Sequence, residues 1–109
     1  MIARIWHGRV RTANAERYRA FLKARAIPDY ASVPGNEAIY ILEREMGGEM
    51  HFATLTFWRD ELSIRQFAGD ELTQAKYYSE DKDFLLEFEP EVVHYEVVGS
   101  STGAANVKC

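Results

Sequence analysis

The side chain of this sequence best suited to acid–base chemistry is that of His7, which stands in the β-forming segment from Ile2 to Val10. If that segment is a strand, alternation places His7 on the same face as Ala3 and Ile5. An imidazole among apolar neighbours stays neutral at pH 7, which is the form that a general base needs. A histidine that is hydrogen-bonded at the surface of the sheet is the alternative interpretation.

The other histidines, His51 and His94, also fall in predicted strands and are far from His7 in the sequence. All three would have to share one sheet face to bind a metal, and no cysteine or carboxylate accompanies them at a metal-binding spacing. We therefore expect hydrogen-bonded histidines and no metal site. Cys109 is the only cysteine, so neither an internal disulfide nor a cysteine zinc site is expected.

Short motifs that bind nucleotides or mark hydrolases are missing: there is no phosphate loop, GxGxxG, HExxH or GxSxG. No nucleotide cofactor is therefore expected. Two hydrogen-bond donors stand out instead, the indole of Trp58 and the phenol of Tyr77. Trp58 is equally consistent with a core or rim aromatic, and Tyr77 and Tyr78 with one ring in the core and one at the surface.

Size and charge limit the classes of function. A chain of 109 residues, 47% of them hydrophobic, makes one domain with a single core. Its net charge of −4 argues against nucleic-acid binding, which needs a basic surface. No apolar run is long enough to cross a membrane, and the charged N-terminal segment does not resemble a signal peptide. We expect a cytoplasmic protein without membrane or nucleic-acid partners.

Charge is unevenly distributed along the chain. Residues 1–30 are rich in Lys and Arg, whereas residues 70–96 are rich in Asp and Glu. Two solvated faces explain this pattern, and complementary charge between two chains is the alternative.

The apolar pattern predicts the elements that position these side chains. A strand over 2–10 is followed by a helix that Thr12 or Asn14 caps and that Pro28 stops or kinks. After a turn at 34–36, strands over 37–46 and 50–59 are joined by Gly47-Gly48, a hairpin signal. A second helix begins at Asp60, is interrupted near Gly69 and resumes toward Tyr78. A last strand covers 92–98. The buried candidates in the second helix are Leu62, Ile64, Phe67 and Ala68.

The element order β-α-β-β-α-β predicts an α+β ferredoxin-like fold, a four-stranded antiparallel sheet with both helices on one face. In the third strand, His51, Ala53, Leu55 and Phe57 alternate with Phe52, Thr54, Thr56 and Trp58. Neither set is polar enough to face water, so the second face needs a cover. A second copy of the chain is the simplest cover, and it would also bury Trp6, Leu55 and Phe57. The domain spans residues 1–98, and residues 99–109 form a small, polar C-terminal tail.

Three segments together resemble a known family: the run from Tyr77 to Val98, the turn Pro34-Gly35-Asn36 and the strand end Thr56-Phe57-Trp58. Over roughly residues 2–98 the chain resembles the antibiotic biosynthesis monooxygenase-like family of dimeric α/β barrels. The resemblance implies a homodimer in which two sheets form the barrel.

For haem-degrading members of this superfamily, the resemblance places a tryptophan at Trp58 beside an asparagine of the first strand and a histidine of the second helix. This chain has His7 at the asparagine position and Lys76 or Tyr77 in place of the histidine. Haem degradation is therefore not expected.

Other members oxidise polyketide-type aromatics without flavin, haem or metal. The resemblance then implies a cofactor-independent monooxygenase that deprotonates a small phenolic or quinone-like molecule and lets the anion react with dioxygen. His7 is the expected base, and Trp58 or Tyr77 the donor to oxygen intermediates. The substrate-binding candidates are Thr54, Thr56, Phe67 and Lys76. We expect the site in the cleft between the sheet and the helices.

Two other functions stay open, because this architecture supports many activities. One is a dimeric domain that binds a small apolar ligand without converting it. The other is an isomerase, lyase or decarboxylase on the same scaffold, which needs the pocket but no oxygen. His7 is the only serious candidate for a titratable catalytic group.

Overall fold

The computed structural model of the protein describes residues 1–101. It is built on one antiparallel sheet with the strand order β2-β3-β1-β4. Its strands are β1 (Ile2–Arg11), β2 (Asn36–Met46), β3 (Glu49–Trp58) and β4 (Val93–Glu96). The predicted ferredoxin-like α+β fold is confirmed, although β4 is shorter than expected. The prediction for Cys109 and most of that for the tail fall outside the described residues.

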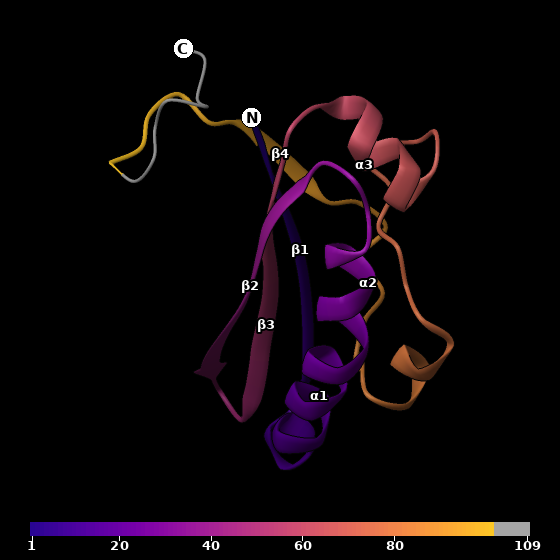
Figure 1. Cartoon of the computed structure of the whole chain (residues 1–109). Helices are drawn as coiled ribbons and strands as arrows, with labels where there is room; N and C mark the ends of the chain where they lie inside the picture. Colours follow the sequence, from indigo (N-terminus) through magenta and orange to yellow (C-terminus); the bar gives the residue numbers. More distant parts are fainter. Residues whose placement is uncertain (102–109) are drawn as a thin grey trace.

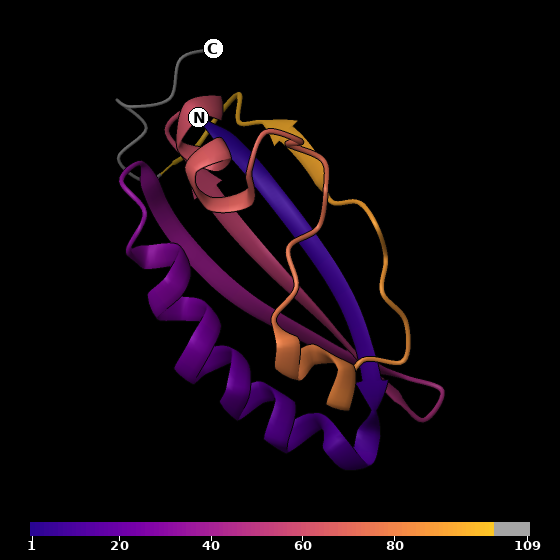
Figure 2. The ribbon, with the colours of Figure 1, turned by 90° about the vertical axis from the view of Figure 1, so that its right-hand side faces the viewer.

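The first helical region is one rod made of α1 (Ala15–Phe21), a wider π-helical segment η2 (Leu22–Ala26) and α2 (Ile27–Ala31), after the 3₁₀ turn η1 (Thr12–Asn14) (Figure 2). Of the two effects predicted for Pro28, stopping the helix is wrong, since the helical residues continue to Ala31. Within η2, Ile27 donates its backbone N–H to the carbonyl of Leu22, one residue further back than in an α-helix, and the rod continues through Pro28. Neither Thr12 nor Asn14 caps the rod through a side-chain hydrogen bond.

Helix α3 (Glu61–Ala68) begins as predicted, because the carboxylate of Asp60 accepts the backbone N–H of Ser63 at 2.9 Å. Its buried face contains Ile64 and Phe67, whereas Leu62, expected in the core, is 65% exposed. The predicted continuation toward Tyr78 is wrong. Helix α3 stops at Gly69, whose φ is 93°.

Residues 70–92 contain only one short helical turn, the 3₁₀ turn η3 (Ser79–Asp83). This segment folds back on itself: Ala75 donates its backbone N–H to Pro90 at 2.9 Å, and Val92 donates to Thr73 at 2.7 Å. These bonds replace the helical ones that the sequence pattern suggested. We call residues 70–92 the long loop.

The hairpin between β2 and β3 turns at Gly47 and Gly48, whose φ values are 57° and 82°. Both angles lie in the left-handed region, which favours glycine, so the Gly-Gly signal is confirmed. The register pairs Tyr40 with Leu55 and Leu42 with Ala53.

All helices and the turn η3 lie on one side of the sheet (Figures 1 and 2). We call this side the helix side and the other the open face. Trp6, Phe52 and Trp58 are buried on the helix side. The expectation that Trp6 needs a second chain is therefore wrong, because its ring is only 5% exposed and Gly8 leaves the space that it fills.

The open face carries large uncovered apolar side chains. Tyr40 and Leu42 of β2 are 54% and 48% exposed, and Val93 and Tyr95 of β4 are 51% and 59% exposed. A sheet face of this kind is unusual for a monomer in water. It fits the expectation that the second face needs a cover.

Candidate functional site

The sheet separates the residues that the sequence analysis assigned to one cleft. Thr54, Thr56 and Trp58 project to the helix side, where all three are buried. His7 pairs with Ala53 in the β1–β3 register and lies on the open face. The expectation that His7 faces the cleft between sheet and helices is therefore wrong, because residues 6 and 7 point to opposite faces of β1 and Trp6 takes the inward position.

Trp58 is a core residue whose ring is fully buried. The ring centroid of Phe67 lies 5.6 Å away and that of Tyr30 lies 6.2 Å away. The indole N–H donates to the hydroxyl of Thr56 at 2.8 Å, and that hydroxyl donates to the backbone carbonyl of Arg4 at 3.2 Å. The predicted donor atom of Trp58 is thus bonded inside the core.

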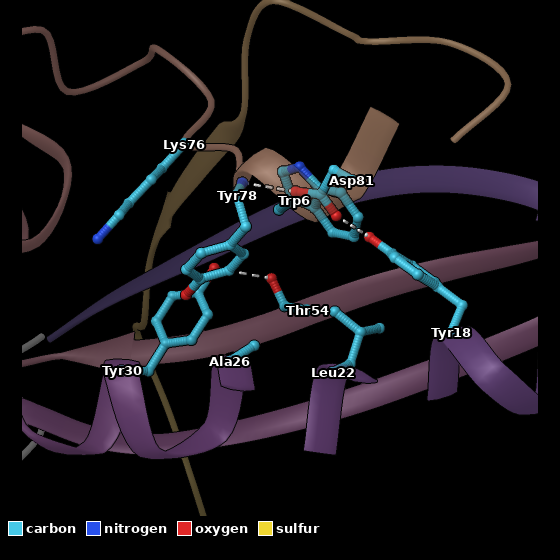
Figure 3. A pocket seen from close by; sticks show the side chains of 9 residues that line it. All are labelled: Trp6, Tyr18, Leu22, Ala26, Tyr30, Thr54, Lys76, Tyr78 and Asp81. Atoms are coloured by element: carbon cyan, nitrogen blue, oxygen red, sulfur yellow. Dashed lines mark hydrogen bonds between the residues drawn. The ribbon is translucent and has the colours of Figure 1, made fainter. Parts of the chain in front are cut away.

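On the helix side there is a narrow groove beneath the long loop (Figure 3). Two of the predicted binding residues, Thr54 and Lys76, line it. The full lining is Trp6, Tyr18, Leu22, Ala26, Tyr30, Thr54, Lys76, Tyr78 and Asp81. Its interior holds only about 10 Å³, within a depression of about 250 Å³ that includes open solvent. An interior of 10 Å³ accommodates no more than about one water molecule.

Lys76 and Tyr78 of this groove share one carboxylate partner, Asp29, which lies beside the groove. The carboxylate of Asp29 accepts the phenol of Tyr78 at 2.5 Å and the ammonium of Lys76 at 3.2 Å. Burial acts to raise the pKa of Asp29, but these two partners outweigh it and lower that pKa overall. The ammonium of Lys76 also lies 4.2 Å from the centre of the Phe67 ring.

Asp81 closes the other end of the groove. It accepts the phenol of Tyr18 at 2.8 Å and the backbone N–H of Tyr78 at 2.7 Å. Burial raises the pKa of this carboxyl group despite those two bonds. The carboxylates of Asp81, in the groove lining, and of Asp29, beside the groove, therefore serve to hold the long loop against the helical rod.

Tyr77 connects the long loop with the open face. Its ring packs edge-on against Trp6 and Phe88, and its phenol donates to the backbone carbonyl of Glu89. Burial raises the pKa of this phenol, so it stays protonated as a donor. Tyr77 thus fixes the position of Glu89 rather than reaching the helix-side groove.

Glu89 in turn contacts the residue that the sequence analysis chose as base. Its carboxylate is hydrogen-bonded to Nδ1 of His7, and Nε2 of His7 lies 2.9 Å from Nδ1 of His51. The two imidazole rings are stacked with centroids 5.1 Å apart. The side chains of Glu89, His7 and His51 are 33%, 38% and 23% exposed. We call His7 and His51 the histidine pair.

The proton positions in the hydrogen-bonded series Glu89–His7–His51 follow from the hydrogen-bond partners of each imidazole. A carboxylate can only accept, so neutral His7 carries its proton on Nδ1 and donates to Glu89. Nε2 of His7 then accepts the Nδ1–H of His51. When both imidazoles are neutral, the ring nitrogen left with a free lone pair is Nε2 of His51, whose nearest carboxylate oxygen, on Glu49, is 3.9 Å away. That atom is where a proton can be taken up.

Arg9 holds the acidic side chains around the histidine pair. Its guanidinium donates to Glu49 at 2.9 Å and to Glu87 at 3.3 Å. Because Glu49 is bonded to Arg9, it stays beyond hydrogen-bond distance of His51. The basic N-terminal and the acidic C-terminal parts of the sequence thus pair here within one chain.

A pocket of about 140 Å³ adjoins the histidine pair on the open face. Its lining consists of His7, Leu42, Glu43, Arg44, His51, Phe52 and Ala53. Glu43 is bonded to Arg19 at 2.5 Å and 2.7 Å, and Arg19 comes from α1. The carboxylate of Glu43 is therefore held on the helix side, and the pocket has an apolar floor at Leu42 and Ala53 with the imidazoles at one side.

Two residues of this site, His51 and Glu89, were not predicted as functional. A signal for His51 was present, because it falls on the same predicted sheet face as Ala53, the partner of His7. Nothing in the pattern indicated Glu89, since the long loop was expected to be partly helical. Thr56, Phe67 and Trp58 belong to the core, and Lys76 and Thr54 to the groove on the opposite side of the sheet.

Within the described part of the chain, no three or more His, Cys, Asp or Glu side chains are grouped so that they could hold a metal ion. None of the described helices is long and apolar enough to span a membrane.

Comparison with known proteins gives structural relatives only. No family model matches the sequence, and no curated protein is significantly similar to it. Among solved structures, Rv0793 from Mycobacterium tuberculosis superimposes with a TM-score of 0.64 at 17% identity, over 93% of this chain and 98% of that one. A mutant of MhuD, crystallised with two manganese protoporphyrin IX molecules per active site, gives a TM-score of 0.58 at 17% identity, over 94% and 100%. These similarities show that the chain shares their fold.

Proposed function

We propose that this chain is a small cofactor-independent monooxygenase that acts on an acidic phenol or quinone-like compound as a homodimer, with the histidine pair as its base. This is the activity that the resemblance to the antibiotic biosynthesis monooxygenase-like family suggested. One observation carries it: the hydrogen-bonded series Glu89–His7–His51 ends at Nε2 of His51, which has a free lone pair and lies beside a pocket of about 140 Å³. A base oriented by a second group that is itself held by a carboxylate is a recurring catalytic arrangement.

The volume of the pocket limits the substrate. An apolar cavity of about 150 Å³ binds one benzene molecule, so 140 Å³ accommodates one aromatic ring. The apolar floor at Leu42 and Ala53 suits the ring face, and the hydroxyl group would point to Nε2 of His51. A two- or three-ring substrate needs additional space from the partner chain.

The chemistry needs only dioxygen as a second reactant. The substrate hydroxyl gives its proton to Nε2 of His51, and the electron-rich anion reacts with dioxygen at a ring carbon. For a 1,4-hydroquinone, loss of water then gives a hydroxyquinone: the substrate supplies all four electrons, one oxygen atom enters the ring and the other leaves as water. The positive charge left on the imidazoles is stabilised by Glu89 through His7.

A second copy of the chain would remove this site from contact with water. Packing of the two open faces would cover Tyr40, Leu42 and Tyr95 and exclude water from around the histidine pair. Removal from water strengthens each electrostatic interaction in the pocket. We therefore place the site at or next to the dimer interface.

The dimer is the first expected result. Sedimentation equilibrium at micromolar concentration is expected to give about twice the chain mass of 12.5 kDa. Tyr40→Glu combined with Leu42→Glu, which puts charge on the open face without touching the core, is expected to give the monomer. A stable wild-type monomer would contradict the proposed cover of the open face.

Oxygen consumption tests the activity. With 1,4-dihydroxybenzene or 1,4-dihydroxynaphthalene, the wild-type protein is expected to consume one dioxygen per substrate above the rate of autoxidation and to release no hydrogen peroxide. Equal rates with and without protein would contradict the oxygenase. Product formed without oxygen would instead indicate an isomerase, lyase or decarboxylase that uses the same base.

Haem is a poor fit for the helix-side groove. None of the groove's nine lining residues is a histidine, and its interior of about 10 Å³ is far smaller than a porphyrin. The residues of the groove therefore do not form a site for a porphyrin such as the one bound in the MhuD structure, and no step of the proposed reaction uses haem.

A non-catalytic ligand-binding domain is the second candidate. The pocket of about 140 Å³ beside the histidine pair favours it, because the pocket accommodates one aromatic ring whether or not that ring is converted. Such a domain would bind phenols without oxygen uptake or product.

A further inference from the structure

Two arginines flank His51 on the open face of the sheet, one on each neighbouring strand. The register pairs His51 with Arg9 of β1 and with Arg44 of β2. Cross-strand partners project from the same face of a sheet and lie close together, so these three residues form one row across the open face. Both arginines therefore stand next to the residue that takes the substrate proton in the proposed reaction.

The two arginines differ in their partners. Arg9 donates to the carboxylates of Glu49 and Glu87, which offset its charge. Arg44 is exposed, and within residues 1–101 no carboxylate lies at ion-pair distance from it. Its guanidinium is thus the cation of this row whose charge is not offset. A planar guanidinium is suited to bind a carboxylate through two parallel hydrogen bonds.

Arg44 also lines the pocket of about 140 Å³ beside the histidine pair. The carboxylate that lines this pocket, on Glu43, is bonded to Arg19 and so does not offset the charge of Arg44. Packing of a second copy on the open face would remove Arg44 from water together with the histidine pair. A cation that is buried without an anion is costly, so an anion in the pocket would stabilise the assembled site.

We propose that the substrate of this pocket is a hydroxylated aromatic monocarboxylate, whose carboxylate pairs with Arg44 while its hydroxyl group faces Nε2 of His51. This inference rests on the proposed function and deepens it by naming the substrate class. Neighbouring strands lie about 4.8 Å apart, so one ring that carries the two groups in meta positions can reach both residues. Arg44 is then the residue that selects an acidic substrate over a neutral phenol.

Binding of probes that do not react with oxygen separates this inference from the oxygenase activity. 3-Hydroxybenzoate and its neutral amide, 3-hydroxybenzamide, have the same shape, and calorimetric titration of the wild-type protein measures the affinity of each. The acid is expected to bind at least about tenfold more tightly, because only the acid forms a charge-assisted pair with Arg44. Equal affinities, or no binding of the acid, would overturn the proposal. Equal affinities are the result expected if a carboxylate of a second chain already pairs with Arg44.

Variants assign the preference to Arg44. Arg44→Met is expected to abolish the preference for the acid and to leave the affinity for the amide unchanged. Arg44→Lys keeps the charge without the planar fork and is expected to retain part of the preference. Arg59→Met is the matched control with wild-type affinities, since Arg59 is 64% exposed and follows the opposite end of β3 from His51. A preference for the acid that persists in Arg44→Met would contradict the proposal.

Oxygen uptake then distinguishes the two proposals. With 2,5-dihydroxybenzoate the wild-type protein is expected to have a KM at least about tenfold lower than with 1,4-dihydroxybenzene, and Arg44→Met is expected to lose this difference. Tighter binding of 3-hydroxybenzoate without any oxygen uptake would support the carboxylate site and contradict the oxygenase. Oxygen uptake with the same KM for both hydroquinones would support the oxygenase and contradict the substrate class.

Discussion

Replacing His51 by alanine is expected to lower kcat for oxygen consumption by about 100-fold or more, the usual contribution of a general base. His51 carries the free lone pair at the end of the chain of hydrogen bonds, so its loss removes the atom that takes the substrate proton. His7→Ala is expected to have a similar effect, because it disconnects His51 from Glu89. Steady-state oxygen uptake on variants that remain dimeric measures this.

Two matched variants, each of which replaces one glutamate of the long loop by glutamine, separate the role of Glu89 from the general charge of the loop. Glu89→Gln removes the negative charge that stabilises the protonated histidine pair, and a large fall in kcat is expected. Glu87→Gln makes the same change two residues away, where the carboxylate binds Arg9 and no other residue in the described part of the chain, and a much smaller effect is expected. Equal turnover in Glu89→Gln and the wild-type protein would exclude the carboxylate from the mechanism.

The second large effect concerns stability. Trp58→Ala is expected to reduce the free energy of unfolding by about 3–5 kcal/mol, which is typical for the loss of a large buried aromatic ring. The ring is fully buried between Tyr30 and Phe67, and its removal also leaves the hydroxyl of Thr56 without its donor. Chemical denaturation followed by circular dichroism measures the change.

Trp58→Phe is the control for this prediction, because it keeps most of the ring contacts and loses only the indole N–H and part of the volume. Its expected cost is clearly smaller than that of alanine. A Trp58→Ala variant with wild-type stability and impaired phenol binding would instead return Trp58 to the pocket role that the family resemblance suggested.

The fold was predictable because its signals are local. Alternating side chains defined β1 and β3, Gly47 and Gly48 marked the hairpin, and Asp60 marked the start of α3. The errors occurred where tertiary contacts override local preference. A π-helical segment accommodates Pro28 within a continuing helix, and backbone pairing inside the long loop, from Ala75 to Pro90, replaces the expected second part of α3.

The candidate site was less predictable because it depends on which face of a strand each residue occupies. Neighbouring residues of a strand point to opposite faces of the sheet. Trp6 therefore enters the core, while His7, one position further along β1, lies on the open face. The family resemblance placed His7 toward the helices, whereas the structure gives that position to Trp6. Glu89 reaches His7 through a non-helical loop held by Tyr77, and no periodicity in the sequence predicts such a contact.

The histidine pair is the centre of this account, and the crystal structure of the protein with a bound phenol tests it most directly. Crystals grown without oxygen in the presence of 1,4-dihydroxynaphthalene are expected to contain a dimer with the substrate hydroxyl within hydrogen-bond distance of Nε2 of His51. The ring is expected to lie against Leu42 and Ala53. A phenol bound instead in the helix-side groove, against Lys76 and Tyr78, would contradict the account.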